Sequence, residues 1–149
     1  MQRVSRVSVG SLLLRLVIVL ASLIATAHAA STLPGTVGAS PQYASGWIDF
    51  PQPVDFAKGD RLRLVIGGSA TKILLRMLSK GHSRDSSEGL LGGVIDVPKT
   101  RVVELTLGEN RAQVVQISVH GGPNPWGKFP LPGNGPATLQ AVERLPMKK

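Results

Sequence analysis

The sequence predicts an all-β protein whose single domain, residues 46–145, is an antiparallel β-sandwich of two sheets with jelly-roll architecture. Two observations lead to this prediction. Short runs with apolar residues at alternating positions follow one another through the domain, as expected of strands that bury one face. Turn residues separate these runs, drawn from 17 Gly and 11 Pro, at the spacing that is typical of sandwich strands.

Seven segments are predicted as strands because their side chains alternate between two faces. The clearest is 60–67, where Leu62, Leu64 and Ile66 share one face. In 112–120, Val115 falls on the apolar face with Ile117 and Val119. The seven segments are 46–50, 60–67, 71–80, 94–97, 101–107, 112–120 and 137–145.

Segment 71–80 fits two structures. Ile73, Leu74, Met77 and Leu78 would lie on one face of a helix. With a period of two, one face instead carries only apolar residues and the other is mixed: Ile73, Leu75 and Met77 alternate with Lys72, Leu74, Arg76 and Leu78. We predict a strand, because a strand followed by the polar loop 81–93 continues the rhythm of the neighbouring segments.

Residues 1–29 have the features of a secretory signal helix. Arg3 and Arg6 precede an apolar run, and Ala27-His28-Ala29 has the small-x-small pattern of a cleavage site. Arg15 interrupts the apolar stretch, which leaves it shorter than the roughly 20 residues of a membrane span. We therefore expect cleavage, export to the periplasm or the extracellular space, and no membrane span in the mature chain.

The expected mature chain is less basic than the whole sequence, whose formal net charge is +8. It begins with a flexible lead-in, residues 30–45, which is rich in small residues and lacks an apolar period. It ends in a basic tail, residues 146–149. The absence of Cys excludes disulfides and thiol chemistry. An exported chain with neither Cys nor an Asn-x-Ser/Thr acceptor favours a bacterial envelope.

Several motifs come close to known chemistry but do not match it. Residues 122–129 have spacings like a phosphate-binding loop, but Pro123 and Pro125 lack the N–H groups that such a loop needs. The run 119–123 resembles the oxyanion-hole turn of α/β-hydrolases, yet no serine follows it to serve as the nucleophile. His82, Asp85, Glu88 and His120 match no metal-ligand spacing. We predict no catalytic residue, metal or cofactor.

The candidate ligand site is the loop 121–136, which is rich in Gly and Pro and contains Trp126. An exposed indole is a stacking platform for sugar rings and other flat ligands. Nearby polar side chains could add hydrogen bonds, and the predicted ligand-binding residues are Trp126, His120, Asn124, Lys128 and Asn134. The alternative is that Trp126 packs over a sheet edge. Trp47 and Phe50 are predicted to close one end of the core.

A second candidate is a basic sheet face formed by Arg61, Arg63, Lys72 and Arg76. Such a face would attract anionic polymers or acidic proteins, although rows of Lys and Arg also serve only to keep a sheet soluble. The export signal argues against nucleic acid as a partner.

The strand rhythm and loop-rich ends resemble small jelly-roll modules of the galactose-binding-like kind. This resemblance implies ligand binding through loops. We therefore expect an exported, non-catalytic binding module for a carbohydrate or an anionic envelope polymer. Two alternatives stay open: a structural or interaction subunit that binds another envelope protein, and a small secreted hydrolase.

Overall fold

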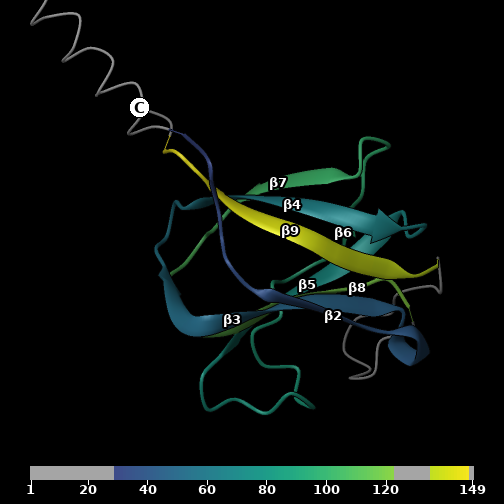
Figure 1. The fold of residues 1–149 in the computed structure, drawn as a ribbon, viewed down its shortest axis with the longest axis horizontal. Helices are drawn as coiled ribbons and strands as arrows, with labels where there is room; N and C mark the ends of the chain where they lie inside the picture. The colour runs from purple at the N-terminus through teal and green to yellow at the C-terminus, as the bar shows by residue number, and fades with distance from the viewer. Residues whose placement is uncertain (1–28, 123–134, 148–149) are drawn as a thin grey trace, which may run out of the picture.

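Two antiparallel sheets form the fold (Figure 1). The computed structural model describes residues 29–122 and 135–147. The first sheet contains, in spatial order, β1 (Ser31–Thr32), β9 (Ala137–Leu145), β4 (Arg61–Gly68) and β7 (Val102–Thr106). The second contains β2 (Thr36–Ser40), β3 (Ser45–Phe56), β8 (Arg111–His120), β5 (Lys72–Ser79) and β6 (Ile95–Asp96). The all-β prediction is confirmed, and each of the seven predicted segments contains a strand.

The core lies between the two sheets. From the first sheet, β4 contributes Leu62, Leu64 and Ile66, which are at most 1% exposed. From the second sheet, Ile73 and Met77 of β5 face them across the same cluster. Burial of each such side chain contributes roughly 1.5–3 kcal/mol relative to exposure. The predicted strand at 71–80 is therefore present as β5, and no helix forms there.

The strands pair from the two ends of the chain inwards. β1 pairs with β9, β3 with β8, β4 with β7 and β5 with β6. Successive pairs fall in alternate sheets. β2 stands outside this nesting, because it forms a hairpin with β3 at the edge of the second sheet.

Two strands change the face that they bury part-way along, which corrects the predicted alternation. In β8, Val114 belongs to the core and Val115 does not, because the register with both neighbouring strands shifts between Val114 and Gln116. In β9, Val142 rather than Ala141 joins the core, because its register with β4 shifts between Leu139 and Ala141. One extra residue at a bulge reverses the alternation beyond it.

The stretch 30–45 was expected to be a flexible lead-in, and the structure corrects this. It contains β1, β2 and the 3₁₀ turn η1 (Pro41–Tyr43). β2 pairs with β3 along all five of its residues. Both strands lie at sheet edges and are largely exposed, so they carry no apolar alternation that would reveal them. Of the expected tail 146–149, residues 148 and 149 lie outside the described residues, as do residues 1–28 of the expected signal segment 1–29.

One arginine holds the turn between β4 and β5. The Arg101 guanidinium donates to the carbonyl oxygens of Ile66, Gly67 and Ala70, at distances of 3.2, 3.1 and 2.6 Å. These carbonyls would lose a charged donor in Arg101→Met. We expect the variant to lower the free energy of unfolding by about 3 kcal/mol, measured by urea denaturation. A loss below about 0.5 kcal/mol would mean that water replaces the guanidinium at no cost.

Candidate functional site

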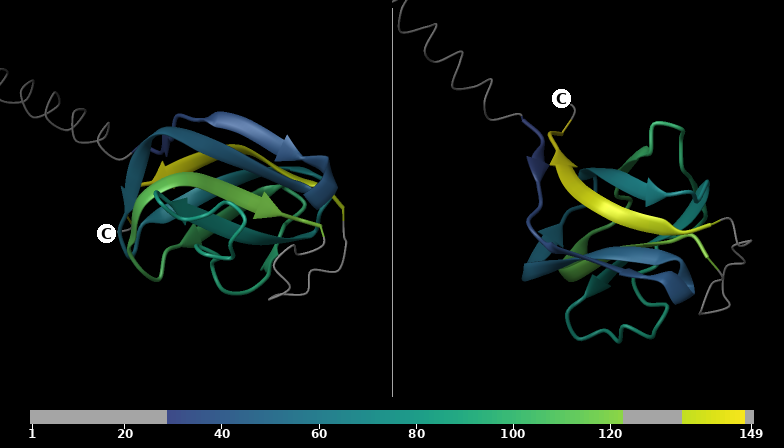
Figure 2. Two further views of the ribbon diagram at one scale, coloured as in Figure 1. Left: turned by 90° about the horizontal axis from the view of Figure 1, so that it is seen from below. Right: turned by 45° about the vertical axis from the view of Figure 1, so that its right-hand side comes forward.

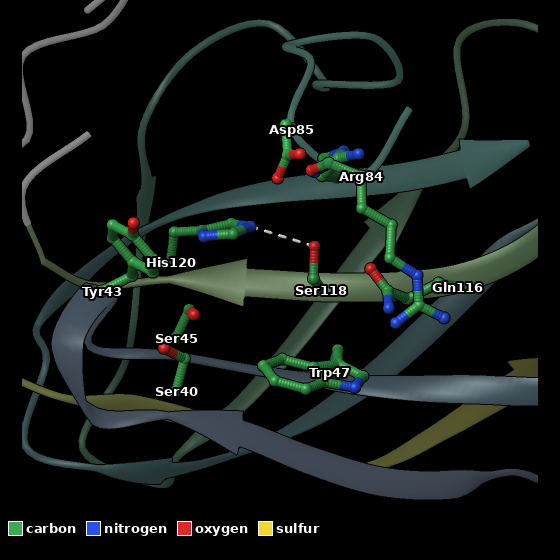
Figure 3. A pocket seen from close by; sticks show the side chains of 10 residues that line it. Ser40, Tyr43, Ser45, Trp47, Arg84, Asp85, Gln116, Ser118 and His120 are labelled. Carbon is green, nitrogen blue, oxygen red and sulfur yellow. Dashed lines mark hydrogen bonds between the residues drawn. The ribbon is translucent and has the colours of Figure 1, made fainter. Parts of the chain in front are cut away.

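A pocket of about 430 Å³ lies on the outer face of the second sheet. Its floor is formed by neighbouring positions on three strands. Trp47 on β3 is in register with Ser118 on β8, which is in register with Arg76 on β5. One step along, Ser45 is in register with His120. Figure 3 shows Trp47 and Ser118 in the middle of the pocket, with Tyr43 and His120 at one end and Gln116 and Arg84 at the other.

Buried polar side chains gather in this pocket. In the described part of the chain, every buried polar or charged side chain lines the pocket. Their exposed fractions lie between 2% and 7%, and the residues are Ser45, Arg76, Gln116, Ser118 and His120. Polar groups on the outer face of a sheet are normally solvated, and burying them costs free energy. Binding sites typically have such a group of polar side chains in one concave region.

The loop between β5 and β6, residues 80–94, forms one wall of the pocket. It projects from the outer side of the second sheet (Figures 1 and 2). Beneath it, Arg76 donates to the carbonyl oxygens of Ser83, Arg84 and Glu88 at 2.9, 2.8 and 3.1 Å. Burial lowers the pKa of Arg76, against the opposing effect of nearby Asp85, but a guanidinium stays charged. Arg76 therefore fixes the loop over β5.

Asp49 connects the sheet to this loop. Its carboxylate accepts hydrogen bonds from the indole Nε1 of Trp47 at 3.1 Å and from Nε2 of Gln116 at 2.9 Å. It also forms an ion pair with Arg84 of the loop at 3.2 Å. The carboxylate of Asp49 thus orients two side chains that line the pocket, and it connects the loop at the pocket rim to β3.

Ser118 and His120 are in contact at the floor. The hydroxyl oxygen of Ser118 lies 3.0 Å from Nε2 of His120. Burial, and then the positive charge of Arg76, lower the pKa of His120 from its usual 6.5 to about 4. The imidazole is therefore neutral at pH 7, with one ring nitrogen that donates and one that accepts.

The arrangement is suited to hydrogen bonding rather than to acid–base catalysis. A serine beside a histidine resembles a nucleophile and its base. However, a base works best with a pKa near the working pH, and the groups that shift His120 both lower its pKa. In a Ser-His-Asp arrangement a carboxylate would favour the imidazolium instead. The aromatic ring, hydroxyls, amide and neutral imidazole of the pocket provide donors and acceptors for a polar ligand.

The described residues contain no group of three or more His, Cys, Asp or Glu side chains that could hold a metal ion. In the β5–β6 loop, Nδ1 of His82 lies 3.9 Å from Glu88, while His120 is on the pocket floor. Within the described residues, no helix is both long and apolar enough to cross a membrane.

Only one of the predicted ligand-binding residues falls within the structure. His120 lines the pocket, as part of a floor that the sequence did not predict. Trp126, Asn124, Lys128 and Asn134 lie outside the described residues. The loop that contains them follows Gly122, which packs against the backbone of Tyr43.

The structure does not bring the four residues of the predicted basic face together. Arg61 and Arg63 point outward from the first sheet, and there they pair with Glu104 at 3.5 and 2.9 Å. Lys72 and Arg76 belong to the second sheet, on the far side of the core. Lys72 pairs with Asp96 at 3.0 Å, and Arg76 is buried under its loop. The β4 and β5 segments alternate as predicted, but they enter different sheets.

Trp47 is the main site residue that the sequence did not reveal. It was predicted to close one end of the core together with Phe50, but only Phe50 belongs to the core. Trp47 alternates with Ile48 and Phe50, both of which are buried in the core, and it therefore points outward to the pocket. That alternation was the available signal. A Trp on the face that also carries Asp49 does not belong to the core side of a sandwich strand.

Comparisons of the chain with protein-family models, with curated proteins and with solved structures found no match.

Proposed function

We propose that the protein is an exported, non-catalytic binding module whose ligand, a glycan or an anionic envelope component, occupies the pocket between Trp47 and His120. The observation that carries this proposal is the gathering of the buried polar side chains around one pocket. Arg76 fixes the loop and Gln116 holds Asp49, but a sandwich has no structural need to bury Ser and His side chains beside them on an outer face. A ligand that hydrogen-bonds to them explains why they are there.

The nested strand pairing supports the finer proposal that the sandwich is a jelly roll. In that architecture a long antiparallel ribbon is wrapped so that its strand pairs alternate between two sheets, as the pairs β1·β9, β3·β8, β4·β7 and β5·β6 do. β2 is then an addition beside β3. Fold alone does not imply function, so the proposed binding rests on the pocket.

Export rests on the signal-like segment 1–29 of the sequence. We also propose that Trp126, Asn124, Lys128 and Asn134 extend the site. In the sequence they follow Gly122, which lies two residues after the end of β8 and beside Tyr43. A mass measurement on the exported protein tests the export proposal, because cleavage after Ala29 gives a defined product.

A second candidate function, an interaction subunit of the envelope, is favoured by β2. This strand lies at the edge of the second sheet, and residues 29–48 contain no charged side chain. Charges are a common means of preventing edge-to-edge pairing, so β2 is open to an added strand. Co-purification with one partner that persists after the pocket is blocked would favour this function.

The test of the proposed function is binding by the full chain to a glycan array and to envelope polysaccharides. Ser40→Phe places a ring at the rim of the pocket, and Ser31→Phe on β1 is the matched control on the other sheet. We expect Ser40→Phe to abolish binding and Ser31→Phe to retain it. Absence of binding by the folded wild-type protein to every probe would contradict the proposal. Binding that survives in Ser40→Phe would place the ligand elsewhere.

A further inference from the structure

We infer that the ligand is an uncharged sugar in its pyranose form, which stacks on the indole of Trp47 and hydrogen-bonds to the pocket floor. This inference rests on the proposed binding function and names the ligand class. It is carried by three features of the pocket: the fixed position of the indole, the pairing of the lining charges, and the polar groups beside the ring.

The indole of Trp47 lies against Gly38 of β2. The two residues are cross-strand partners, and a Cβ added at Gly38 would come within 2.4–2.7 Å of Nε1, Cε2 and Cζ2 of the ring. These three atoms follow one another along the Nε1 edge of the indole, so this edge lies directly against the glycine. The ring is thereby fixed on this side while Trp47 lines the pocket. No larger residue fits at position 38 unless the ring moves.

The ring nitrogen is fixed as well. Nε1 donates to Asp49 at 3.1 Å, and Asp49 is itself held by Gln116 and Arg84. The indole therefore has a set orientation before any ligand arrives, which lowers the entropy cost of binding. A flat apolar platform of this kind fits the C–H face of a pyranose ring.

Both arginine side chains of the pocket already have partners within the protein. Arg84 forms an ion pair with Asp49. Arg76 donates to three loop carbonyls, and the negative charge of Asp85 favours its charged form by raising its pKa. An anionic ligand would have to compete with these carboxylates and carbonyls. An uncharged ligand leaves all of these contacts in place, so the pocket favours it.

Beside the indole lie polar side chains that can hydrogen-bond to the hydroxyl groups of a sugar. The hydroxyls of Ser45 and Ser118 can donate and accept, and the neutral imidazole of His120 can do both through its two nitrogens. Alternating donors and acceptors of this kind recognise neighbouring hydroxyl groups, each of which also donates and accepts. The volume of about 430 Å³ is at the lower end for ligand pockets, as suits a short saccharide.

The test is titration of the full chain with neutral pyranose oligosaccharides, with uronate oligosaccharides and with inorganic phosphate, each at low and at high salt. We expect neutral sugars to bind with an affinity that salt leaves unchanged. Trp47→Ala should weaken that binding by about tenfold or more. Gly38→Val leaves the Trp in the chain but displaces its ring, and should weaken binding by a similar factor. Arg84→Gln removes one of the contacts that hold Asp49 but leaves the indole itself in the pocket, and it should weaken the binding of neutral sugars by a smaller factor than Trp47→Ala.

The results distinguish the neutral-sugar inference from the proposed binding function. If uronates or phosphate bind instead, with an affinity that falls at high salt and in Arg84→Gln but not in Trp47→Ala, the neutral-sugar inference is wrong and the proposed binding function stands. If no probe binds to wild-type protein whose urea denaturation shows it to be folded, both fail. Near-ultraviolet circular dichroism of Gly38→Val checks that the ring has moved while the fold remains.

Discussion

Arg76→Met is expected to lower the free energy of unfolding by about 3 kcal/mol and to release the β5–β6 loop from the pocket. The guanidinium provides the donors for three carbonyl oxygens of that loop, those of Ser83, Arg84 and Glu88. Methionine keeps the apolar stem on the outer face of β5 but donates no hydrogen bond. The carbonyls must then find water, which the packed loop admits only by opening. Ligand binding should be lost with the wall of the pocket.

Arg101→Met is the matched control, because Arg101 also donates to three carbonyls but at the turn between β4 and β5. Both variants should lose stability in urea. Only Arg76→Met should become sensitive to trypsin at Lys80 and Arg84 under native conditions, since local opening exposes a cleavage site. Equal protection of the loop in the two variants would show that other contacts hold it, and would contradict the role given to Arg76.

The fold was predictable from the sequence to the extent that strands bury one face. Alternation placed Leu62, Leu64 and Ile66 in the core, and the rhythm of the neighbouring strands favoured a strand over a helix for 71–80. It failed at Val115, because the extra residue of a bulge shifts the faces without changing the local composition. It also failed for β1 and β2, since exposed edge strands have no buried face for a pattern to report.

The site was less predictable because its residues meet only through the pairing of strands far apart in the chain. Trp47, Ser118 and Arg76 are neighbours across β3, β8 and β5, and no local spacing contains all three. Arg76 had the composition of a solvated face, but the loop that follows β5 folds back and buries it. His120 was predicted as a ligand residue of the neighbouring loop, and its burial depends on contacts that the sequence does not show.

Acid is expected to destabilise the protein through His120, by about 3 kcal/mol between pH 6.5 and pH 4. The pKa of His120 is lowered from 6.5 to about 4 in the folded state, whereas in the unfolded chain it takes its usual value. Between these two values the unfolded state binds a proton that the folded state does not, so stability rises with pH in that window. At about 1.4 kcal/mol per pH unit, the difference amounts to about 3 kcal/mol.

The measurement is urea denaturation of wild type and His120→Gln over this pH range. Glutamine is neutral at every pH and can still hydrogen-bond to Ser118. The stability difference between the two proteins should be constant above pH 6.5, shift against wild type as the pH falls, and become constant again below pH 4. Carboxylates titrate equally in both proteins and cancel from the difference.

His120 faces Ser118 on its own strand and Arg76 on β5, so protonation creates a buried cation beside a fixed guanidinium. Parallel curves for wild type and His120→Gln would mean that His120 takes up its proton as readily in the folded state as in the unfolded one, and that the pocket floor is open to water.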